Sequence, residues 1–214
     1  MKKFWIQIKL FYYLIQTGRN PKNTEAVLAI GPCLYQLGYL EQARQKVLSD
    51  PKTIELVKTR RLLNPVDLKT LSLRPPGTLA AVYTKHMVSN NLDPQFYKDI
   101  KIENDETYFM MRMRQTHDLW HAITGFNTTV EDEIALLAFM YAQTRSPLIP
   151  LLIGASLLKV GLKNEVRGGL VFSKISQGWQ MGEKAKPIFA LDWEKNWDTP
   201  IEQLRAEFSV TPAY

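Results

Sequence analysis

The chain is poor in cysteine and histidine. Cys33 is the one cysteine among 214 residues, so neither an intramolecular disulfide framework nor a cysteine-based zinc finger can form. A single cysteine also fits a reducing compartment. Only three histidines are present, and two of them, His117 and His121, lie four residues apart, which marks this segment as a candidate site.

The sequence also lacks a long apolar run and a nucleic-acid-binding motif. The most apolar segment, residues 148–162, contains Pro150 and Lys159 and is shorter than the roughly 20 apolar residues of a membrane span, so a buried helix is expected there. The net charge of +6 is compatible with solubility, an anionic membrane surface or an anionic ligand. Nucleic acid is not expected as a partner, because RNP motifs, zinc-finger spacings and long Lys/Arg blocks are absent.

What is present is helical periodicity along nearly the whole chain. Apolar residues make up 45% and charged residues 22%, which is ordinary for a globular protein. We therefore expect an all-α, single-domain multi-helix bundle over residues 1–214, with an apolar groove between helices. Helices are expected at 4–16, at 25–40 after a cap at Thr24 and with a break or kink at Gly31-Pro32, from Pro51, at 78–88, 106–124, about 129–144, 148–162 and 171–182, and from about Pro200.

The N-terminal segment, residues 1–16, is predicted to form a basic, aromatic, amphipathic helix. Two lysines precede Phe4 and Trp5, but Lys9 interrupts the apolar run and no small-residue cleavage site follows, which argues against a signal peptide. Such a helix could pack on the domain or lie on a membrane surface, and the sequence slightly favours packing.

The most informative segment is His-Asp-Leu-Trp-His at residues 117–121. In a helix this spacing places His117 and His121 on one face, one turn apart. Asp118 points about 100° away from His117, so it could ligate a metal at the edge of the site or fix a histidine tautomer. Glu133 follows a turn that Gly125 is expected to begin, and a short antiparallel connection returns it to the histidines. Imidazole and carboxylate donors suit Zn²⁺, Mn²⁺, Fe²⁺ or Co²⁺, with Mg²⁺ less favoured.

Two questions stay open at the level of residue pattern. Glu133 shares a helical face with Met140, but Glu131 shares one with Ile134, so periodicity does not choose which acid closes the site. The two histidines could also be ordinary helix residues, with the acids only following a cap at Thr128 or Thr129. The combination of paired histidines, an acid between them and a returning glutamate favours the metal site.

Long apolar and basic side chains accompany these donors. Methionine and aromatic surfaces adapt to long apolar ligands, and arginines neutralise carboxylate or phosphate groups. At helical spacing, apolar residues of this kind also form cores, and arginines form solvated faces. The candidates for lipid binding are Met110, Met113, Trp120, Leu137, Met140 and Tyr141, and those for anion binding are Arg112, Arg114 and Arg145.

The segment resembles the HDxxH-x11-E signature of the Coq-four family, the family of the fourth coenzyme Q biosynthesis protein. His117, Asp118, His121 and Glu133 match this signature, with eleven residues between the last two. Weaker similarity extends from about residue 11 to about residue 210. It is carried by the Arg-x-Arg pattern at 112–114, by Gly125 and Thr128 in the turn, by Pro-Gly-Thr-Leu at 76–79 and by the Trp…Leu-Arg-x-Glu pattern within 197–208.

The resemblance implies an all-α, peripheral membrane protein of a ubiquinone-biosynthesis complex that binds a prenylated lipid. It also implies decarboxylation and hydroxylation at ring carbon one of a prenylated aromatic acid. The chain would be either the enzyme for this step or a non-catalytic scaffold. By the resemblance, His117, Asp118, His121 and Glu133 are the metal ligands and catalytic residues, which selects Glu133 over Glu131.

Eukaryotic members of the family carry an N-terminal transit segment, whereas this chain begins almost where the resemblance begins. We therefore expect a bacterial-type, cytoplasmic protein on the inner face of the cell membrane; a eukaryotic member would lie on the matrix side of the mitochondrial inner membrane. The expected partners are a prenylated quinone precursor or another isoprenoid lipid, other quinone-biosynthesis proteins, the membrane surface and a second copy of the chain.

A rival interpretation of the His-Asp doublet is an HD-type metal phosphohydrolase. Such enzymes need an upstream histidine and a later aspartate. His86 and Asp192 are the only loose candidates, and neither lies in a recognisable motif.

Overall fold

The computed structural model describes residues 2–20, 23–96, 101–162 and 168–213, which form an all-α fold, as predicted. Over these residues no strand forms, and the one isolated β-bridge joins Thr78 to Pro200. The helices are α1 (Lys2–Arg19), α2 (Thr24–Leu37), α3 (Glu41–Val47), α4 (Pro51–Thr59), α5 (Leu68–Ser72), α6 (Leu79–Ser89), α7 (Asp105–Thr124), α8 (Val130–Thr144), α9 (Leu148–Leu162), α10 (Gly168–Lys184), a 3-10 turn (Glu194–Asn196) and α11 (Ile201–Phe208).

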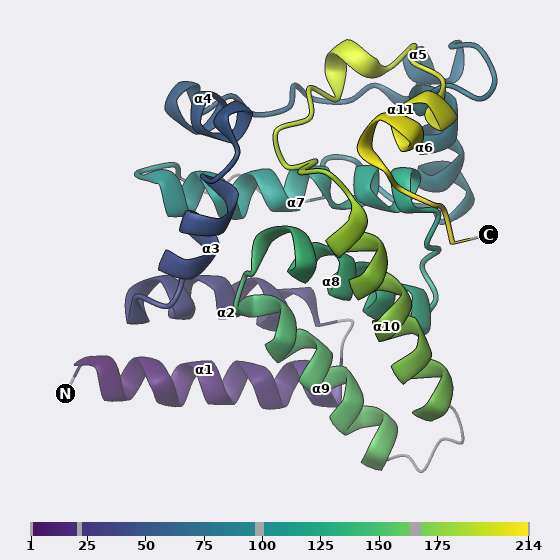
Figure 1. Cartoon of the computed structure of the whole chain (residues 1–214). Helices are drawn as coiled ribbons and strands as arrows, with labels where there is room; N and C mark the ends of the chain where they lie inside the picture. The colour runs from purple at the N-terminus through teal and green to yellow at the C-terminus, as the bar shows by residue number, and fades with distance from the viewer. Residues whose placement is uncertain (1, 21–22, 97–100, 163–167, 214) are drawn as a thin grey trace.

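Helix α7 crosses the middle of the molecule, and the other helices gather around it (Figure 1). Helices α1 and α2 pack on each other and on α9 at one end, whereas α5, α6 and α11 lie at the opposite end. Helix α8 lies between α7 and α10 and contacts both. The elements that carry the predicted donors are therefore at the centre of the fold.

Helices α7 and α8 meet within the main hydrophobic core. Trp120 of α7 is fully buried, and its ring meets Phe139 of α8 edge-on, with the ring centroids 5.7 Å apart. The last carbonyl groups of α7 lack partners within the helix, and the buried Arg205 of α11 donates to two of them. Its Nε lies 2.9 Å from the Ile123 oxygen and its Nη2 lies 3.1 Å from the Ala122 oxygen. The C-terminal helix thus anchors the end of α7.

Helix α2 is continuous from Thr24 to Leu37 with Pro32 inside it, so the helix does not break at Gly31-Pro32, and the kink predicted as the alternative stays a prediction. Proline has no backbone N–H, so the carbonyl group of Leu28, four residues earlier, has no helical partner. Arg114 of α7 replaces that partner, with its Nη2 atom 3.2 Å from the Leu28 oxygen. The long-range hydrogen bond removes part of the cost of an internal proline and fixes Arg114 against α2.

Other boundaries follow the local capping chemistry closely. Asn23, rather than Thr24, accepts the capping hydrogen bond of α2, and the helix ends at Gly38 rather than at residue 40. Helix α4 begins at Pro51 as predicted, after a cap by Asp50. Helices α3 and α5 were not predicted, because seven and five residues are too few for a clear periodicity.

Helices α8 and α10 approach closely because glycine lies at the crossing. A β-carbon at Gly178 would clash with the backbone carbonyl of Ala135. One turn later, a β-carbon at Gly182 would lie 2.6 Å from the side chain of Ala142. This pair of glycines lets α10 support the face of α8 that is turned away from α7.

We expect Gly178→Ala to destabilise the protein by about 1–3 kcal/mol, because the obstructing atoms are backbone atoms that cannot move aside. For a chain of this size, that corresponds to a fall of roughly 2–12 °C in Tm. Gly154→Ala in α9 is the matched control, because no atom lies within 4 Å of its β-carbon position. Thermal unfolding followed by circular dichroism measures both variants. Equal Tm values for the two would contradict the close crossing.

Candidate metal centre

The two long helices of the centre are connected by a short turn that begins at Gly125. Gly125 has φ +75°, a conformation that favours glycine, and its N–H donates to the carbonyl of His121. The side chain of Thr129 then caps α8 by accepting from the N–H of Asp132 at 3.2 Å. The predicted end of α7 is therefore confirmed, and Thr129 rather than Thr128 begins the next helix.

The turn brings Glu133 of α8 back to both histidines of α7. The Glu133 Oε1 atom lies 3.3 Å from His121 Nε2, and its Oε2 atom lies 3.6 Å from His117 Nε2. The two imidazole rings meet nearly at right angles, with centroids 4.9 Å apart. One donor atom from each of the three residues lies within 4.8 Å of the others.

One hydrogen bond sets the orientation of His121. Its Nδ1 lies 2.9 Å from the carbonyl oxygen of Phe126, just after the turn. A carbonyl oxygen only accepts hydrogen bonds, so Nδ1 carries a proton, and in the neutral ring Nε2 then presents the lone pair. The side chain of His121 is fully buried, and its Nε2 makes no hydrogen bond. A buried imidazole lone pair held in this way is how proteins present histidine to a metal.

Asp118 extends the cluster on its other side, towards α6. Its Oδ1 lies 3.9 Å from Nε2 of His86, and these two residues form a second possible donor group together with His121. Sequence reasoning considered His86 only as a loose candidate outside any motif, yet the structure places its ring against His121, with centroids 4.8 Å apart. Asp192 is elsewhere, paired with Arg61 at 2.9 Å, so the aspartate of an HD-type site is not supplied by that residue.

The electrostatics of the cluster favour a positive charge at its centre. Burial acts to raise the pKa of Glu133, but His117 and His121 outweigh it and hold this pKa well below its ordinary value. Burial would lower the pKa of His117, but the Glu133 carboxylate raises it above the usual value. For Asp118, burial is again outweighed by the surrounding histidines, which lower its pKa. Two ionised carboxylates in a partly buried site require a cation or protons to balance them.

The residues present fit a divalent cation. The donors are imidazole nitrogens and carboxylate oxygens, which together suit a first-row transition metal or zinc better than magnesium. Two donor atoms that each lie about 2.1 Å from one ion are roughly 3–4 Å apart, and the measured separations of 3.3 and 3.6 Å fall in that range. His117, His121 and Glu133 are therefore spaced to hold one ion, and Asp118 joins His121 in the neighbouring donor group.

An apolar groove of about 160 Å³ lies beside the centre, between α2, α7, α8 and α9. His117 and Arg114 of α7 and Ser146 before α9 are the polar residues in an otherwise apolar lining. Four of the predicted lipid-binding residues also line it, namely Met110, Met113, Leu137 and Met140. Leu148 and Leu152 of α9, which sequence reasoning did not select, complete the wall.

The remaining predicted ligand-binding residues do not line the groove. Trp120 is packed in the core against Phe139, on another side of α7. Tyr141 stacks on Trp179 of α10 instead. Arg112 is buried and donates to the Leu191 carbonyl, and Arg145 pairs with Glu183 at 2.8 Å. Neighbours in sequence are separated here because successive residues of a helix point about 100° apart. Arg114 is thus the one predicted anion-binding residue that lines the groove.

Comparisons with known proteins identify the family of the chain. The family model of the coenzyme Q (ubiquinone) biosynthesis protein Coq4 matches residues 10–213. The mitochondrial ubiquinone biosynthesis protein coq4 of Aspergillus niger is 28% identical over 195 residues, which cover 89% of this chain and 66% of that protein. The COQ4 homolog of Danio rerio is 28% identical over 196 residues, covering 90% of this chain and 71% of that protein. The crystal structure of a Nostoc punctiforme protein assigned provisionally to ubiquinone biosynthesis superposes with a TM-score of 0.85 at 27% identity, covering 95% of each chain.

The structure distinguishes the two glutamates that the residue pattern left open. Of the two, only Glu133 belongs to a donor group within the described residues. We expect Glu133→Gln to weaken Zn²⁺ binding at least tenfold, since the amide keeps the shape but loses the charge. Glu131→Gln, two residues earlier on α8, should bind Zn²⁺ as the unmodified chain does. Isothermal titration calorimetry on the two variants makes the comparison, and an equal loss in both would contradict this assignment.

Proposed function

Because the chain belongs to the Coq4 family of coenzyme Q (ubiquinone) biosynthesis proteins, we propose that it binds a prenylated aromatic acid and acts on its ring at a metal centre. The prenyl tail lies in the groove between α2, α7, α8 and α9, and the ring faces His117. The reaction is the oxidative removal of the ring carboxyl group. The groove thus binds the prenyl tail, and the donor cluster holds the metal that acts on the ring.

The observation that carries the proposal is that His117 belongs to both features. Its Nε2 faces Glu133 within the donor cluster, and the same residue lines the apolar groove. A ligand in the groove therefore reaches the centre without crossing the core. An apolar site with a few convergent polar groups is the usual form of a small-molecule site.

The residues at the groove suit an amphiphile with an anionic head. The guanidinium of Arg114 is fixed against α2 by its hydrogen bond to Leu28 and lies on the same wall as His117. It can neutralise a ring carboxylate, which the ionised Asp118 and Glu133 would otherwise repel. Met110, Met113 and Leu137 offer flexible apolar contacts to the tail and exclude water from the ring.

A divalent cation in the cluster would supply Lewis-acid or redox chemistry at the substrate's ring. The overall reaction breaks the bond between the ring and its carboxyl carbon and forms a ring–hydroxyl bond. The carboxyl group leaves as carbon dioxide, and the substrate is oxidised by two electrons. With O2 as oxidant and one water consumed, hydrogen peroxide balances the atoms and electrons.

A non-catalytic scaffold is the second candidate, because the same groove could present the lipid to partner enzymes. An HD-type phosphohydrolase is less well supported, since Asp192 lies outside the cluster in an ion pair with Arg61. The two remaining candidates differ in whether the purified chain converts its ligand.

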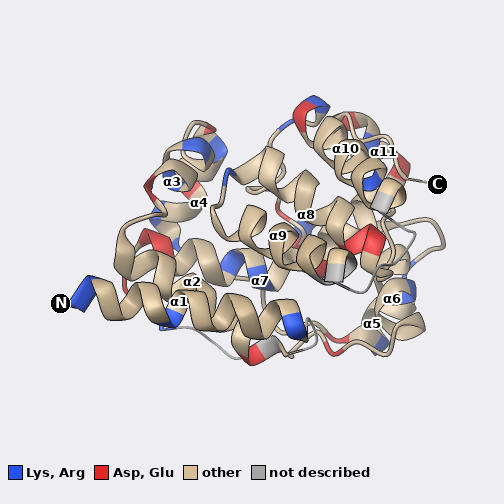
Figure 2. Cartoon of the chain, turned by 90° about the horizontal axis from the view of Figure 1, so that it is seen from below, with Lys and Arg blue, Asp and Glu red and all other residues tan. Residues whose placement is uncertain are grey.

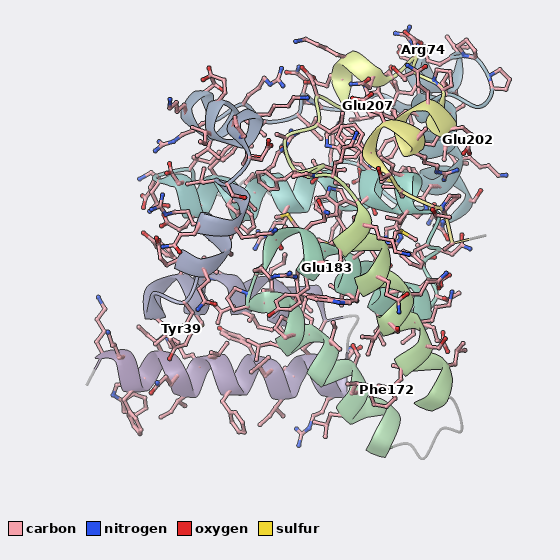
Figure 3. All side chains as sticks on the ribbon, in the orientation of Figure 1. Tyr39, Arg74, Phe172, Glu183, Glu202 and Glu207 are labelled. Carbon is pink, nitrogen blue, oxygen red and sulfur yellow. The ribbon has the colours of Figure 1, made fainter. Side chains whose placement is uncertain are left out.

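The outer face of α1 supports a membrane location. Helix α1 packs on α2 and α9 through one side, and Phe4, Trp5 and Phe11 remain between 62% and 66% exposed. The helix has no acidic residue, and Lys and Arg mark both of its ends (Figure 2). Side chains project from α1 away from the rest of the chain, and the exposed Phe172 of α10 lies at the same end of the molecule (Figure 3). No helix among the described residues could cross a membrane. An interfacial helix on an anionic membrane accounts for these features.

We expect His121→Ala to lose both its bound metal and its turnover of a prenylated aromatic acid, because the variant lacks the best-fixed donor. Metal is measured by mass spectrometry of the purified chain, and turnover by the release of carbon dioxide under O2. Full turnover in the metal-free variant would contradict the metal-dependent reaction. If the unmodified chain retains prenyl lipid and metal but converts nothing with O2 present, the scaffold replaces the enzyme.

The membrane location is tested separately with vesicles. Trp5→Glu combined with Phe11→Glu should reduce flotation with vesicles of anionic phospholipid at least tenfold, because the apolar contact becomes repulsive. Leu73→Glu is the control, since Leu73 is 85% exposed and follows α5 at the opposite end of the molecule. If the control floats as poorly as the double variant, the binding surface is not α1.

A further inference from the structure

The donor cluster also borders a second cavity, which shares no lining residue with the groove. A cavity of about 280 Å³ between α6 and the α7–α8 turn is lined by His86 and His121 on its inner side. Asn90, Asn127 and Arg205 also line it, so polar side chains reach it from α6, from the turn and from α11. The two histidines lie where this cavity meets the cluster, whereas His117 lies on the side of the groove.

The imidazole of His86 is almost fully buried, and one of its nitrogen atoms has no partner in the part of the chain that the structure describes. The side chain of His86 is 9% exposed, and its Nε2 makes no hydrogen bond within the described residues. A buried polar atom without a partner is costly, so its presence calls for a ligand or an ion. The atom lies 3.9 Å from Oδ1 of Asp118, within the range expected for two donors on one ion.

The fold holds His86 at this position from two directions. Its backbone carbonyl accepts from the side chain of Asn90 at 2.8 Å, and Asn90 in turn accepts from the hydroxyl of Thr128 at 2.7 Å. Its ring stacks on that of His121, with an interplanar angle of 21°. Helix α6 is thus tied to the turn that positions Glu133.

The two donor groups describe one ion rather than two. His121 belongs to both of them, and its Nδ1 is engaged by the Phe126 carbonyl. Only the Nε2 lone pair of His121 is available, and one lone pair binds one ion. Glu133 and His117 lie near His121 in one group, and Asp118 and His86 lie near it in the other.

We propose that His86 is a further ligand of the metal centre, a third imidazole contributed by α6. The inference rests on the metal in the proposed function. Three nitrogen donors shift the preference further from Mg²⁺ towards Zn²⁺, Fe²⁺ or Co²⁺. With His86 bound, the centre borders the cavity beside α6 as well as the groove, so water or another small molecule can reach it while a lipid fills the groove.

The test uses the full chain loaded with Co²⁺ and observed by proton NMR in water. A histidine bound through Nε2 keeps an exchangeable Nδ1–H, whose signal is strongly shifted by the paramagnetic ion. We expect three such signals from the unmodified chain and two from His86→Gln. The variant should also bind Co²⁺ about 10–100-fold more weakly. Lys85→Gln, which changes an exposed neighbour on α6, should keep all three signals.

The possible results distinguish a failure of His86 as a ligand from a failure of the metal centre itself. Two shifted signals from the unmodified chain would place His86 outside the coordination sphere and overturn the inference, while the metal centre would stand. Failure of the unmodified chain to bind Co²⁺ or Zn²⁺ would overturn both. The count in the unmodified chain decides the question even if His86→Gln does not fold.

Discussion

The hydrogen bond between Nδ1 of His121 and the carbonyl oxygen of Phe126 is the constraint on which the rest of the centre depends. It closes the turn after Gly125, and the closed turn carries Glu133 back to α7. It also selects the tautomer of the neutral His121 ring whose Nε2 lone pair points into the cluster. A single 2.9 Å contact thus determines both the path of the chain and the chemistry of the donor at the centre of the cluster.

Much of the fold supports the end of α7 around that contact. Arg205 of α11 donates to the last carbonyl groups of the helix, and the N–H of Ala213 donates to the carbonyl of Thr124 at 2.9 Å. Helix α10 packs closely on α8 at Gly178, where it approaches the backbone of Ala135. The centre is therefore built on rigid elements, which is what a metal site needs when its donors come from different helices.

The sequence specifies the parts of the site that depend on local geometry. The spacing of His117 and His121 and the turn at Gly125 follow from the helical period and from backbone sterics, and both were predicted. The choice of Glu133 over Glu131 needed the family resemblance, because both lie on a helix that is apolar on most sides. His86 could not be placed, since its contact with Asp118 depends on how α6 packs against α7. The hydrogen bond of Arg114 could not be predicted either, since its acceptor is the carbonyl group left free by Pro32 in a distant helix.

We expect one metal ion at the place where the donor cluster of α7 and α8 meets the apolar groove. Crystals of the protein as purified, measured with X-rays on both sides of the absorption edges of zinc, iron and cobalt, test this expectation most directly. We expect an anomalous peak about 2.0–2.2 Å from Nε2 of His117, Nε2 of His121 and a Glu133 oxygen. We also expect continuous electron density for a lipid in the groove beside it. An anomalous map without a peak at these donors, from crystals of protein that converts its substrate, would contradict the metal site.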